Sequence, residues 1–409
     1  MFKPFKSVLH RPALRVASVC LAMLGGAVQA NAVEITAEYR ASVDRNEFRN
    51  TTPSSGYCVD YGCEGDLFSI SLPVTYDRTV KSGLPPIPQR WSLKTPGETT
   101  VNVVSDRGDT APLKLQITHV AQQLREGGTP LEDTNNPAGH YSAGGGCSWV
   151  TGQIWEQAPS RAGFVWQVND PRSPSLCYPT STYADDQNDV TPFANDLSIG
   201  YKLILPRPHT MPTGTYYGSV TFSVGEVGDF SLGSNVTNLS TNSVTLNFTV
   251  TVHHELQVQF PANSESVLIE PVNGWQKWLD TGIPPTDIRG SLPFRLTTSG
   301  PFSVVMNCGE QGIGEACVMR NQRSSEPVNF GARLYPPKGL EVEGNPGVEA
   351  PWRDTLIHGK PLQYRTRGFM SSVLGKVEFY TSWTEAAKLA QSPGDKWVGL
   401  VTLVFDATI

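Results

Sequence analysis

Apolar and polar residues alternate over much of this 409-residue chain. Successive side chains of a β-strand point to opposite faces, so such a run puts its apolar residues on one face of a half-buried strand. The apolar members of three clear runs are Leu113, Leu115 and Ile117; Val220, Phe222 and Val224; and Val244, Leu246, Phe248, Val250 and Val252. These runs predict antiparallel sheets with one apolar face.

Signals for helices are scarce. The best segment is residues 382–390, in which Ser382 is placed to cap a helix and Glu385 to complete a capping box. The chain has 38 Gly and 32 Pro, and charged residues make up 17% of it, a composition typical of many short strands joined by turns. We therefore expect an all-β chain with one short helix.

The alternation is interrupted once by a short polar segment. Residues 253–255 separate Val252, the end of one run, from Leu256, the start of the next. The mature chain is longer than one hydrophobic core commonly serves. We predict two domains in tandem, residues 33–252 and residues 255–409, each large enough for an elaborated immunoglobulin-like β-sandwich.

The first 32 residues have the pattern of a secretory signal peptide. Four basic residues and no acidic ones are accompanied by an apolar run over residues 16–24 and by Ala30-Asn31-Ala32. This pattern predicts cleavage before Val33 and export, and the apolar run is too short for a membrane anchor. The charge would change from 32 basic against 38 acidic residues, −6, to 28 against 38, −10. So acidic a chain is unsuited to binding nucleic acid through bulk charge.

Six cysteines remain after the predicted cleavage, and an even number in an exported chain favours three disulfides. They are Cys58, Cys63, Cys147, Cys177, Cys308 and Cys317. Six cysteines allow 15 pairings, and clustering along the chain favours the neighbours, 58 with 63, 147 with 177, and 308 with 317. A metal site is the alternative, but the adjacent His253 and His254 would point to opposite faces of a strand. We expect structural disulfides and neither metal nor other cofactor.

The sequence contains no pattern of an enzyme active site. It lacks a Gly-x-Ser-x-Gly elbow, a His-Glu-x-x-His motif and a phosphate-binding loop with lysine. The acidic residues 185–189 lack the glycine and terminal glutamate of an EF-hand loop. We expect no enzymatic activity.

Aromatic residues are concentrated between Cys147 and Cys177. They are Trp149, Trp155, Phe164 and Trp166. Aromatic rings supply rigid contact area for sugars or proteins, which makes Trp149 and Trp155 candidates for receptor binding. Packing in the core of the sandwich is the alternative, and we favour it for each of the four residues.

Several segments, in a fixed order, resemble one family of exported proteins. They are residues 197–206 (LSIGYKLILP), 214–222 (GTYYGSVTF), 248–252 (FTVTV) continuing into 256–261 (LQVQFP), and 399–405 (GLVTLVF). In them the chain resembles the minor tip subunits of class-five (alternate chaperone–usher) fimbriae, the tip adhesins and CblD-like pilus biogenesis initiators. The resemblance runs with gaps over nearly the whole mature chain. The first two cysteine pairs also fall where the family's adhesin domain has its two bridges.

The resemblance implies an N-terminal adhesin domain and a C-terminal pilin domain that lacks its seventh strand. The sequence is compatible with this, because it ends soon after Phe405. A periplasmic chaperone would cover the open groove, and a major pilin subunit would then fill it with its N-terminal strand by β-augmentation. We expect Val401, Leu403 and Phe405 to line one wall of this donor-strand groove, with Val258 and Phe260 on the other. Ordinary core positions of a closed sandwich are the alternative.

Residues 33–44 resemble the donor strand that opens the major pilins of this class. A subunit at the tip needs no donor strand, because no subunit lies ahead of it. We interpret the segment as the first strand of the N-terminal sandwich, with a donor strand as the alternative.

The chain departs from the family at the receptor site. Known adhesins of the family use arginines shortly before the first cysteine and in an Arg-Arg pair after the central strand. Here Ser54 and residues 225–228 (GEVG) stand at these places. The resemblance therefore implies a different receptor, for which Arg49 is a substitute candidate. A solvated surface charge is the alternative for Arg49.

These observations predict a minor tip subunit of a chaperone–usher fimbria, acting as host-receptor adhesin and initiator of pilus assembly. Its partners would be a periplasmic chaperone, an outer-membrane usher, a major pilin subunit and a host glycoconjugate or protein receptor. It would pass through the periplasm to the fimbrial tip at the cell surface. The alternatives are a structural tip cap without receptor binding and a secreted carbohydrate-binding protein.

Overall fold

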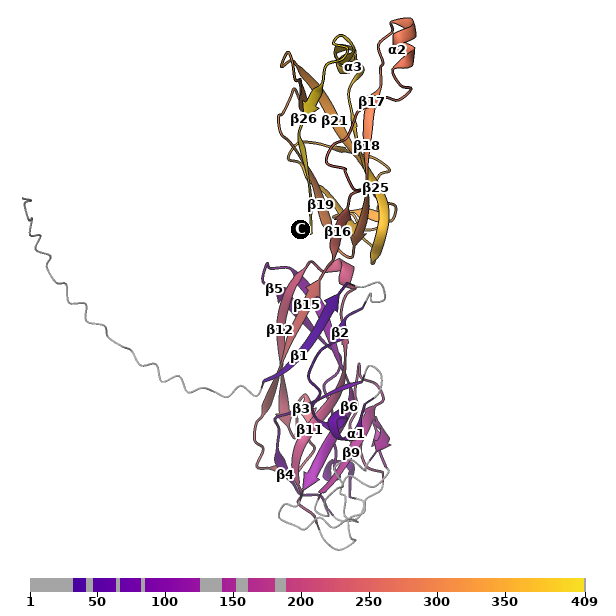
Figure 1. Cartoon of the computed structure of the whole chain (residues 1–409). Coiled ribbons are helices and arrows are strands. Elements are labelled where there is room, and N and C mark those ends of the chain that lie inside the picture. The colour runs from indigo at the N-terminus through magenta and orange to yellow at the C-terminus, as the bar shows by residue number, and fades with distance from the viewer. Residues whose placement is uncertain are drawn as a thin grey trace, which may run out of the picture. The chain divides into compact units, whose positions relative to one another are not determined.

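The computed structural model describes residues 32–41, 47–63, 67–81, 85–125, 142–151, 161–180 and 189–407. The chain is all-β, with short helices between its strands (Figure 1). All three alternating runs lie in strands, which confirms that prediction. The predicted signal peptide lies outside the described residues except for Ala32. No helix in the described ranges is both long and apolar enough to cross a bilayer.

The strands before residue 254 pack around one hydrophobic core. They are β1 (Ala32–Arg40), β2 (Arg49–Asn50), β3 (Phe68–Leu72), β4 (Tyr76–Arg78), β5 (Thr99–Ser105), β6 (Thr110–Arg125), β7 (Gly144–Gly145), β8 (Cys147–Thr151), β9 (Arg161–Val168), β10 (Cys177–Tyr178), β11 (Phe193–Ile204), β12 (Gly214–Gly225), β13 (Phe230–Ser231), β14 (Val236–Thr237) and β15 (Ser243–His253). Most of them form one continuous sheet in the order β14-β4-β11-β6-β5-β12-β15-β1-β2. It surrounds a hydrophobic core, the N-terminal core, that includes Trp91, Leu115, Trp166 and Phe248.

β1 closes one side of this sheet. It pairs in parallel with β15 through nine register pairs, from Ala32↔Thr245 to Arg40↔His253. Its side chains Ile35, Ala37 and Tyr39 are buried in the N-terminal core. The interpretation of this segment as the first strand of the N-terminal fold is confirmed over the residues that the structure describes.

The strands after residue 255 form two sheets. They are β16 (Leu256–Gln259), β17 (Glu270–Pro271), β18 (Ile288–Thr298), β19 (Phe302–Cys308), β20 (Cys317–Asn321), β21 (Pro327–Tyr335), β22 (Leu340–Val342), β23 (Asp354–Leu356), β24 (Leu362–Thr366), β25 (Met370–Tyr380), β26 (Trp397–Gly399) and β27 (Val401–Asp406). The larger sheet has the order β16-β18-β25-β21-β20-β26, and the smaller sheet β22-β24-β19-β27. Both contribute to a second core, the C-terminal core, that includes Phe294, Leu296, Val304 and Val377.

Three short α-helices occur in the described ranges, so the expectation of a single helix was wrong. The predicted helix is α3 (Trp383–Ala390), and the Ser382 hydroxyl accepts a hydrogen bond from the Glu385 amide at 3.4 Å. The Glu385 carboxylate accepts instead from the Asn329 amide at 2.9 Å. The other two are α1 (Tyr57–Tyr61) and α2 (Gln276–Thr281). Both are too short to show the 3.6-residue apolar period on which sequence prediction depends.

Candidate functional site: an open sheet edge beside the C-terminal core

β27 is paired along one edge. It forms six antiparallel register pairs with β19, from Ser303↔Asp406 to Cys308↔Val401. Among the described residues, no strand pairs with its other edge. Backbone N–H and C=O groups on such an edge have no ladder partner, so the edge can template the addition of another strand.

β16 has an unpaired edge as well. It pairs with β18 from Leu256↔Thr298 to Gln259↔Arg295, and no described strand lies on its other side. β16 ends the larger sheet and β27 ends the smaller one. Residues of both strands pack against the C-terminal core. The two free edges therefore border one hydrophobic core.

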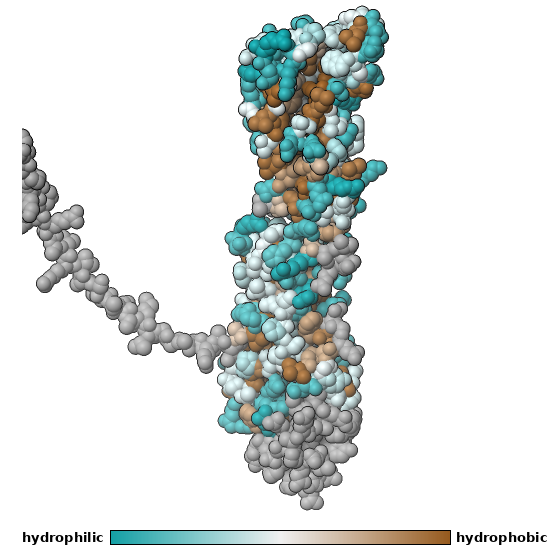
Figure 2. Space-filling view, viewed as in Figure 1, coloured by the Kyte–Doolittle hydropathy of each residue, from teal (hydrophilic) through white to brown (hydrophobic). Residues whose placement is uncertain are grey.

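The predicted groove residues lie at these two edges. Val258 of β16 and Val401, Leu403 and Phe405 of β27 are partly buried against the C-terminal core. Phe260, just after β16, is 39% exposed. Figure 2 shows hydrophobic side chains, coloured brown, gathered at the surface of the C-terminal part of the chain.

Three aromatic rings connect the two edges. The ring centroid of Phe260 lies 6.1 Å from that of Phe294 on β18 and 6.3 Å from that of Phe405 on β27. Phe294 and Phe405 are 5.4 Å apart. Phe405 also lines a small apolar pocket with Leu296 and Val304. The structure thus brings Phe260 and Phe405 together between the two edges.

Sequence reasoning missed two residues that pack against the same core. Val267 and Ile269, which lie between β16 and β17, are partly buried against the C-terminal core. Their spacing of two residues was a usable signal, but the polar residues 262–266 separate them from the run that ends at Phe260.

The last strand of the N-terminal sheet provides an internal comparison. β15 and β27 both have an apolar residue facing inward at every second position. The inward side chains of β15, which is covered by β1, are 0–1% exposed. The inward side chains of β27 are only partly buried. Because both strands direct an apolar residue inward at every second position, we attribute the difference in burial to β1, which covers β15 and has no counterpart beside β27 among the described strands.

The candidate receptor residues are spread over the N-terminal sheet. Arg49 is exposed on β2, opposite Glu38 of β1. Trp149 lies on β8, a strand that is not a neighbour of β2, and packs against the N-terminal core. Trp155 lies outside the described residues. Phe164 and Trp166 are fully buried, which confirms the core interpretation for these two residues.

The three disulfides join the pairs that clustering favoured, Cys58–Cys63, Cys147–Cys177 and Cys308–Cys317, with Cα atoms 5.0, 5.1 and 5.2 Å apart. All six cysteines are therefore occupied as structural bridges. In the part of the chain that the structure describes, no group of three or more His, Cys, Asp or Glu side chains is placed to hold a metal ion.

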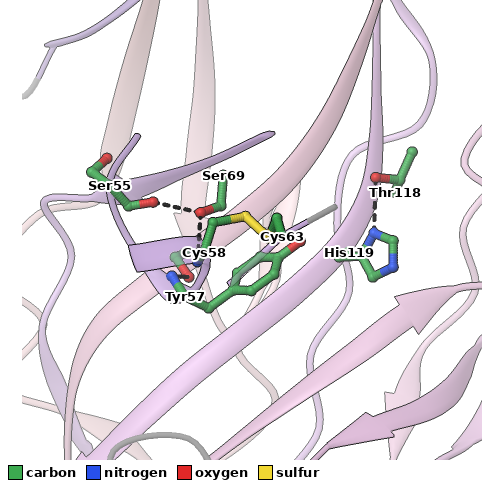
Figure 3. Close-up of a disulfide and its surroundings, with 8 residues drawn as sticks. Ser55, Tyr57, Cys58, Cys63, Ser69, Thr118 and His119 are labelled. Carbon is green, nitrogen blue, oxygen red and sulfur yellow. Dashed lines mark hydrogen bonds between the residues drawn. A yellow bond between two sulfur atoms is a disulfide. The ribbon is translucent and has the colours of Figure 1, made fainter. Parts of the chain in front are cut away.

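The Cys58–Cys63 bridge closes a small loop around α1 (Figure 3). The Cys58 amide donates to the Ser69 hydroxyl at 2.9 Å, and this hydroxyl donates to the Ser55 carbonyl at 2.5 Å. Beside the bridge, Tyr57 is fully buried. These contacts fix the loop on β3, so we assign the bridge a structural role.

His119 of β6 lies next to this buried tyrosine. Its ring centroid is 6.3 Å from that of Tyr57, and its Nδ1 lies 3.0 Å from the Thr118 hydroxyl. Burial lowers the pKa of His119 and raises the pKa of Tyr57. A Cβ atom at Gly200 would come within 2.3 Å of the Tyr57 hydroxyl, so the packing here requires glycine.

Searches against protein-family models and curated proteins gave no match. Among solved structures, the chain is similar to CfaE, the adhesive subunit of CFA/I fimbria of enterotoxigenic Escherichia coli, with 9% identity and a TM-score of 0.27 over 92% of each chain. It is also similar to a chain of the CsuC–CsuE chaperone–tip adhesion subunit complex of archaic Csu pili of Acinetobacter baumannii. That match has 9% identity and a TM-score of 0.19, over 92% of this chain and 98% of the other.

Proposed function

We propose that this protein is the tip subunit of a chaperone–usher fimbria and that another chain supplies a strand beside β27. The observation that carries the proposal is the incomplete burial of the inward side chains of β27, beside an edge with no described partner. β15 also directs an apolar residue inward at every second position, but it is paired on both edges and its inward side chains are fully buried. The resemblance of the sequence to class-five tip subunits suggests which strand would pair with this edge, the N-terminal strand of a major pilin subunit.

The two cores have different roles in this proposal. Residues 255–409 form the pilin domain, whose groove is lined by Val258, Phe260, Val401, Leu403 and Phe405. A periplasmic chaperone covers the groove first, because an exposed apolar edge favours aggregation. At the usher, the N-terminal strand of a major pilin subunit replaces the chaperone by β-augmentation. The tip subunit thereby starts the fibre.

The proposal assigns receptor binding to residues 33–252. The N-terminal sheet is closed by its own strand β1, so this part needs no partner to complete its fold and is available to contact a host receptor. Arg49 is exposed, whereas Trp149 is partly buried, which makes Arg49 the more accessible of the two described candidates. Binding of the mature chain to epithelial cells or mucin tests this assignment, with Arg49→Ala as the variant. A folded protein that binds neither surface would be a structural tip cap.

The open edge can be tested by appending a strand to the chain itself. β27 ends at Asp406, so a short turn followed by the β1 sequence AVEITAEYR would place a second strand antiparallel to β27. The matched control carries proline at the positions of Ile35 and Ala37 in the appended copy, because proline cannot donate to a ladder. Hydrogen exchange followed by mass spectrometry then compares β27 with β15 in each protein.

We expect the appended strand to slow exchange in β16 and β27 and to leave β15 unchanged. The proline control should behave like the unmodified chain. If β27 of the unmodified chain is already as protected as β15, and the appended strand changes nothing, the C-terminal fold is closed and the fimbrial proposal fails.

A further inference from the structure

The outer face of the larger C-terminal sheet carries cations and aromatic rings. Alternate residues of β18, β25 and β21 are buried in the C-terminal core, and the residues between them face outward. The side chains that define this cationic face are Arg289, Arg295, Arg333, Arg353 and Lys376, together with Tyr335, Trp352 and Tyr380. It is a different surface from the open edge of β27, so a ligand can bind it whether or not that edge receives a strand.

Positive charge exceeds negative charge on this face. Glu378 is 3% exposed and lies 3.6–3.8 Å from Arg289, Arg333 and Lys376. Asp287 pairs with Arg289 at 2.5 Å. Glu270 of β17 is exposed and stands opposite Arg289 in the register. The five cations therefore face three carboxylates, although the whole chain has a net charge of −6. A local excess of this sign attracts anionic partners.

Two of these cations are free of ion pairs among the described residues. Arg295 is exposed and donates to the Ser372 carbonyl at 3.0 Å. Arg353 is exposed and lies over the ring of Trp352, with its guanidinium carbon 4.7 Å from the ring centroid. Both guanidinium groups keep donors available for an oxyanion, which Arg binds through charge-assisted hydrogen bonds.

Aromatic rings lie between the cations. The Lys376 ammonium is 4.1 Å from the ring centroid of Tyr335, and the ring of Tyr335 is 5.6 Å from that of Trp352. Trp352 is 71% exposed. Tryptophan, tyrosine and arginine are the residue types that most often dominate binding energy at interfaces. An exposed indole also offers a flat apolar surface to a ligand.

The geometry indicates a long, linear ligand. β18, β25 and β21 are paired on both edges, so a peptide cannot join the sheet here as a strand. The cationic face extends along β18 from Arg289 to Arg295, six residues apart, which corresponds to about 20 Å along the strand. A single phosphate or carboxylate cannot span this distance, whereas a chain of repeated anionic units can. Sugar rings that carry sulfate groups offer both the repeated charge and flat faces for Trp352.

We propose that the cationic face binds a sulfated polysaccharide. Arg295 and Arg353 contact sulfate groups, and the ring of Trp352 stacks on a sugar ring between them. Arg289, Arg333 and Lys376 add to the positive potential of the face but stay paired with Glu378. The buried Glu378 carboxylate needs these cations to offset the cost of its burial.

Heparin serves as the probe, with the mature full-length protein immobilised and binding measured at several salt concentrations. The double variant R295Q/R353Q removes the two unpaired cations and leaves the environment of Glu378 intact. We expect it to weaken heparin binding about fivefold, since two exposed charge pairs at about 0.5 kcal/mol each sum to about 1 kcal/mol. W352A should weaken binding as well, with little change in its salt dependence. Binding of the unmodified protein should decrease as salt rises.

The matched control is K202Q/K277Q, which removes the same charge at two exposed lysines that do not belong to the residues defining the face. It should bind heparin like the unmodified protein, and fully desulfated heparin should bind none of the proteins. Equal loss in this control would show that net charge, not the face, is responsible. Equal binding to duplex DNA or to polyglutamate would show general attraction of polyanions. Either result, or no heparin binding at low salt, overturns the proposal.

Discussion

Two leucines at matching places allow the open edge to be measured directly. Leu246 on β15 is fully buried beneath a sheet that β1 completes. Leu403 on β27 has the same inward position but is only partly buried. Replacing a fully buried leucine by alanine typically costs about 2–5 kcal/mol, and the cost falls when surrounding groups do not enclose the side chain. We expect about 3 kcal/mol for Leu246→Ala and about 1 kcal/mol for Leu403→Ala.

The difference should disappear when the edge is filled. In the protein with the appended β1 sequence, Leu403 is covered, so Leu403→Ala should cost about 2–5 kcal/mol, as expected for a buried leucine. For a unit of about 150 residues, each kcal/mol shifts the melting temperature by about 2–4 °C. Urea unfolding, monitored by hydrogen exchange and mass spectrometry, reports the stability of each core separately.

Val404, which is 40% exposed on the opposite face of β27, gives the control. Val404→Ala should change stability by no more than about 0.5 kcal/mol with or without the appended strand, as surface substitutions usually do. The reasoning is refuted if Leu403→Ala costs as much as Leu246→Ala in the unmodified chain. It is also refuted if the appended strand stabilises the protein but leaves the cost of Leu403→Ala unchanged.

Three further predictions concern the described fold. Ile35→Ala should destabilise the N-terminal core by about 2–4 kcal/mol, and removal of residues 33–39 should prevent that core from folding, as judged by near-UV circular dichroism. Because burial lowers the pKa of His119, the unfolded chain binds its proton more readily. His119 therefore does not change the free energy of unfolding above about pH 6.5 and lowers it as the pH drops below that value. In urea titrations, the free energy of unfolding of His119→Gln should depend less on pH than that of the unmodified protein. Ser382→Ala should cost about 1 kcal/mol through loss of the helix cap, seen as faster amide exchange in α3, whereas Thr384→Ala should not.

The sequence predicted the strands better than it predicted their partners. The runs that include Leu113, Phe222 and Leu246 all became strands with inward apolar side chains, because the two-residue period reports burial on one face directly. The sequence contained no signal that β1 would pair in parallel with β15, since pairing between residues more than 200 positions apart leaves no local pattern. Most of the N-terminal strands are joined into one continuous, curled sheet, and this order of pairing was not predicted.

For the candidate site as well, the sequence predicted the strands but not which residues share a surface. Val258, Val401 and Phe405 could be assigned to groove walls because alternation identified their strands and the family resemblance supplied the missing neighbour. The cationic face was not predicted at all. Arg295, Arg333 and Lys376 lie on three different strands and share one face only through the register of β18, β25 and β21, which sequence periodicity does not determine.

The contrast between the two cores leads to a final prediction about unfolding. Among the described residues, β15 is paired on both edges, by β12 and by β1, whereas β16 and β27 beside the C-terminal core are each paired on one edge. A core with unpaired edges and half-buried side chains gains less from burial for the same loss of chain entropy. We expect the mature protein to unfold in two steps, with the C-terminal core unfolding at the lower urea concentration. The appended strand should move that step alone, because ligation stabilises the part of a protein that binds it. A single transition that moves as a whole would show that the two cores unfold together and that the open edge does not limit stability.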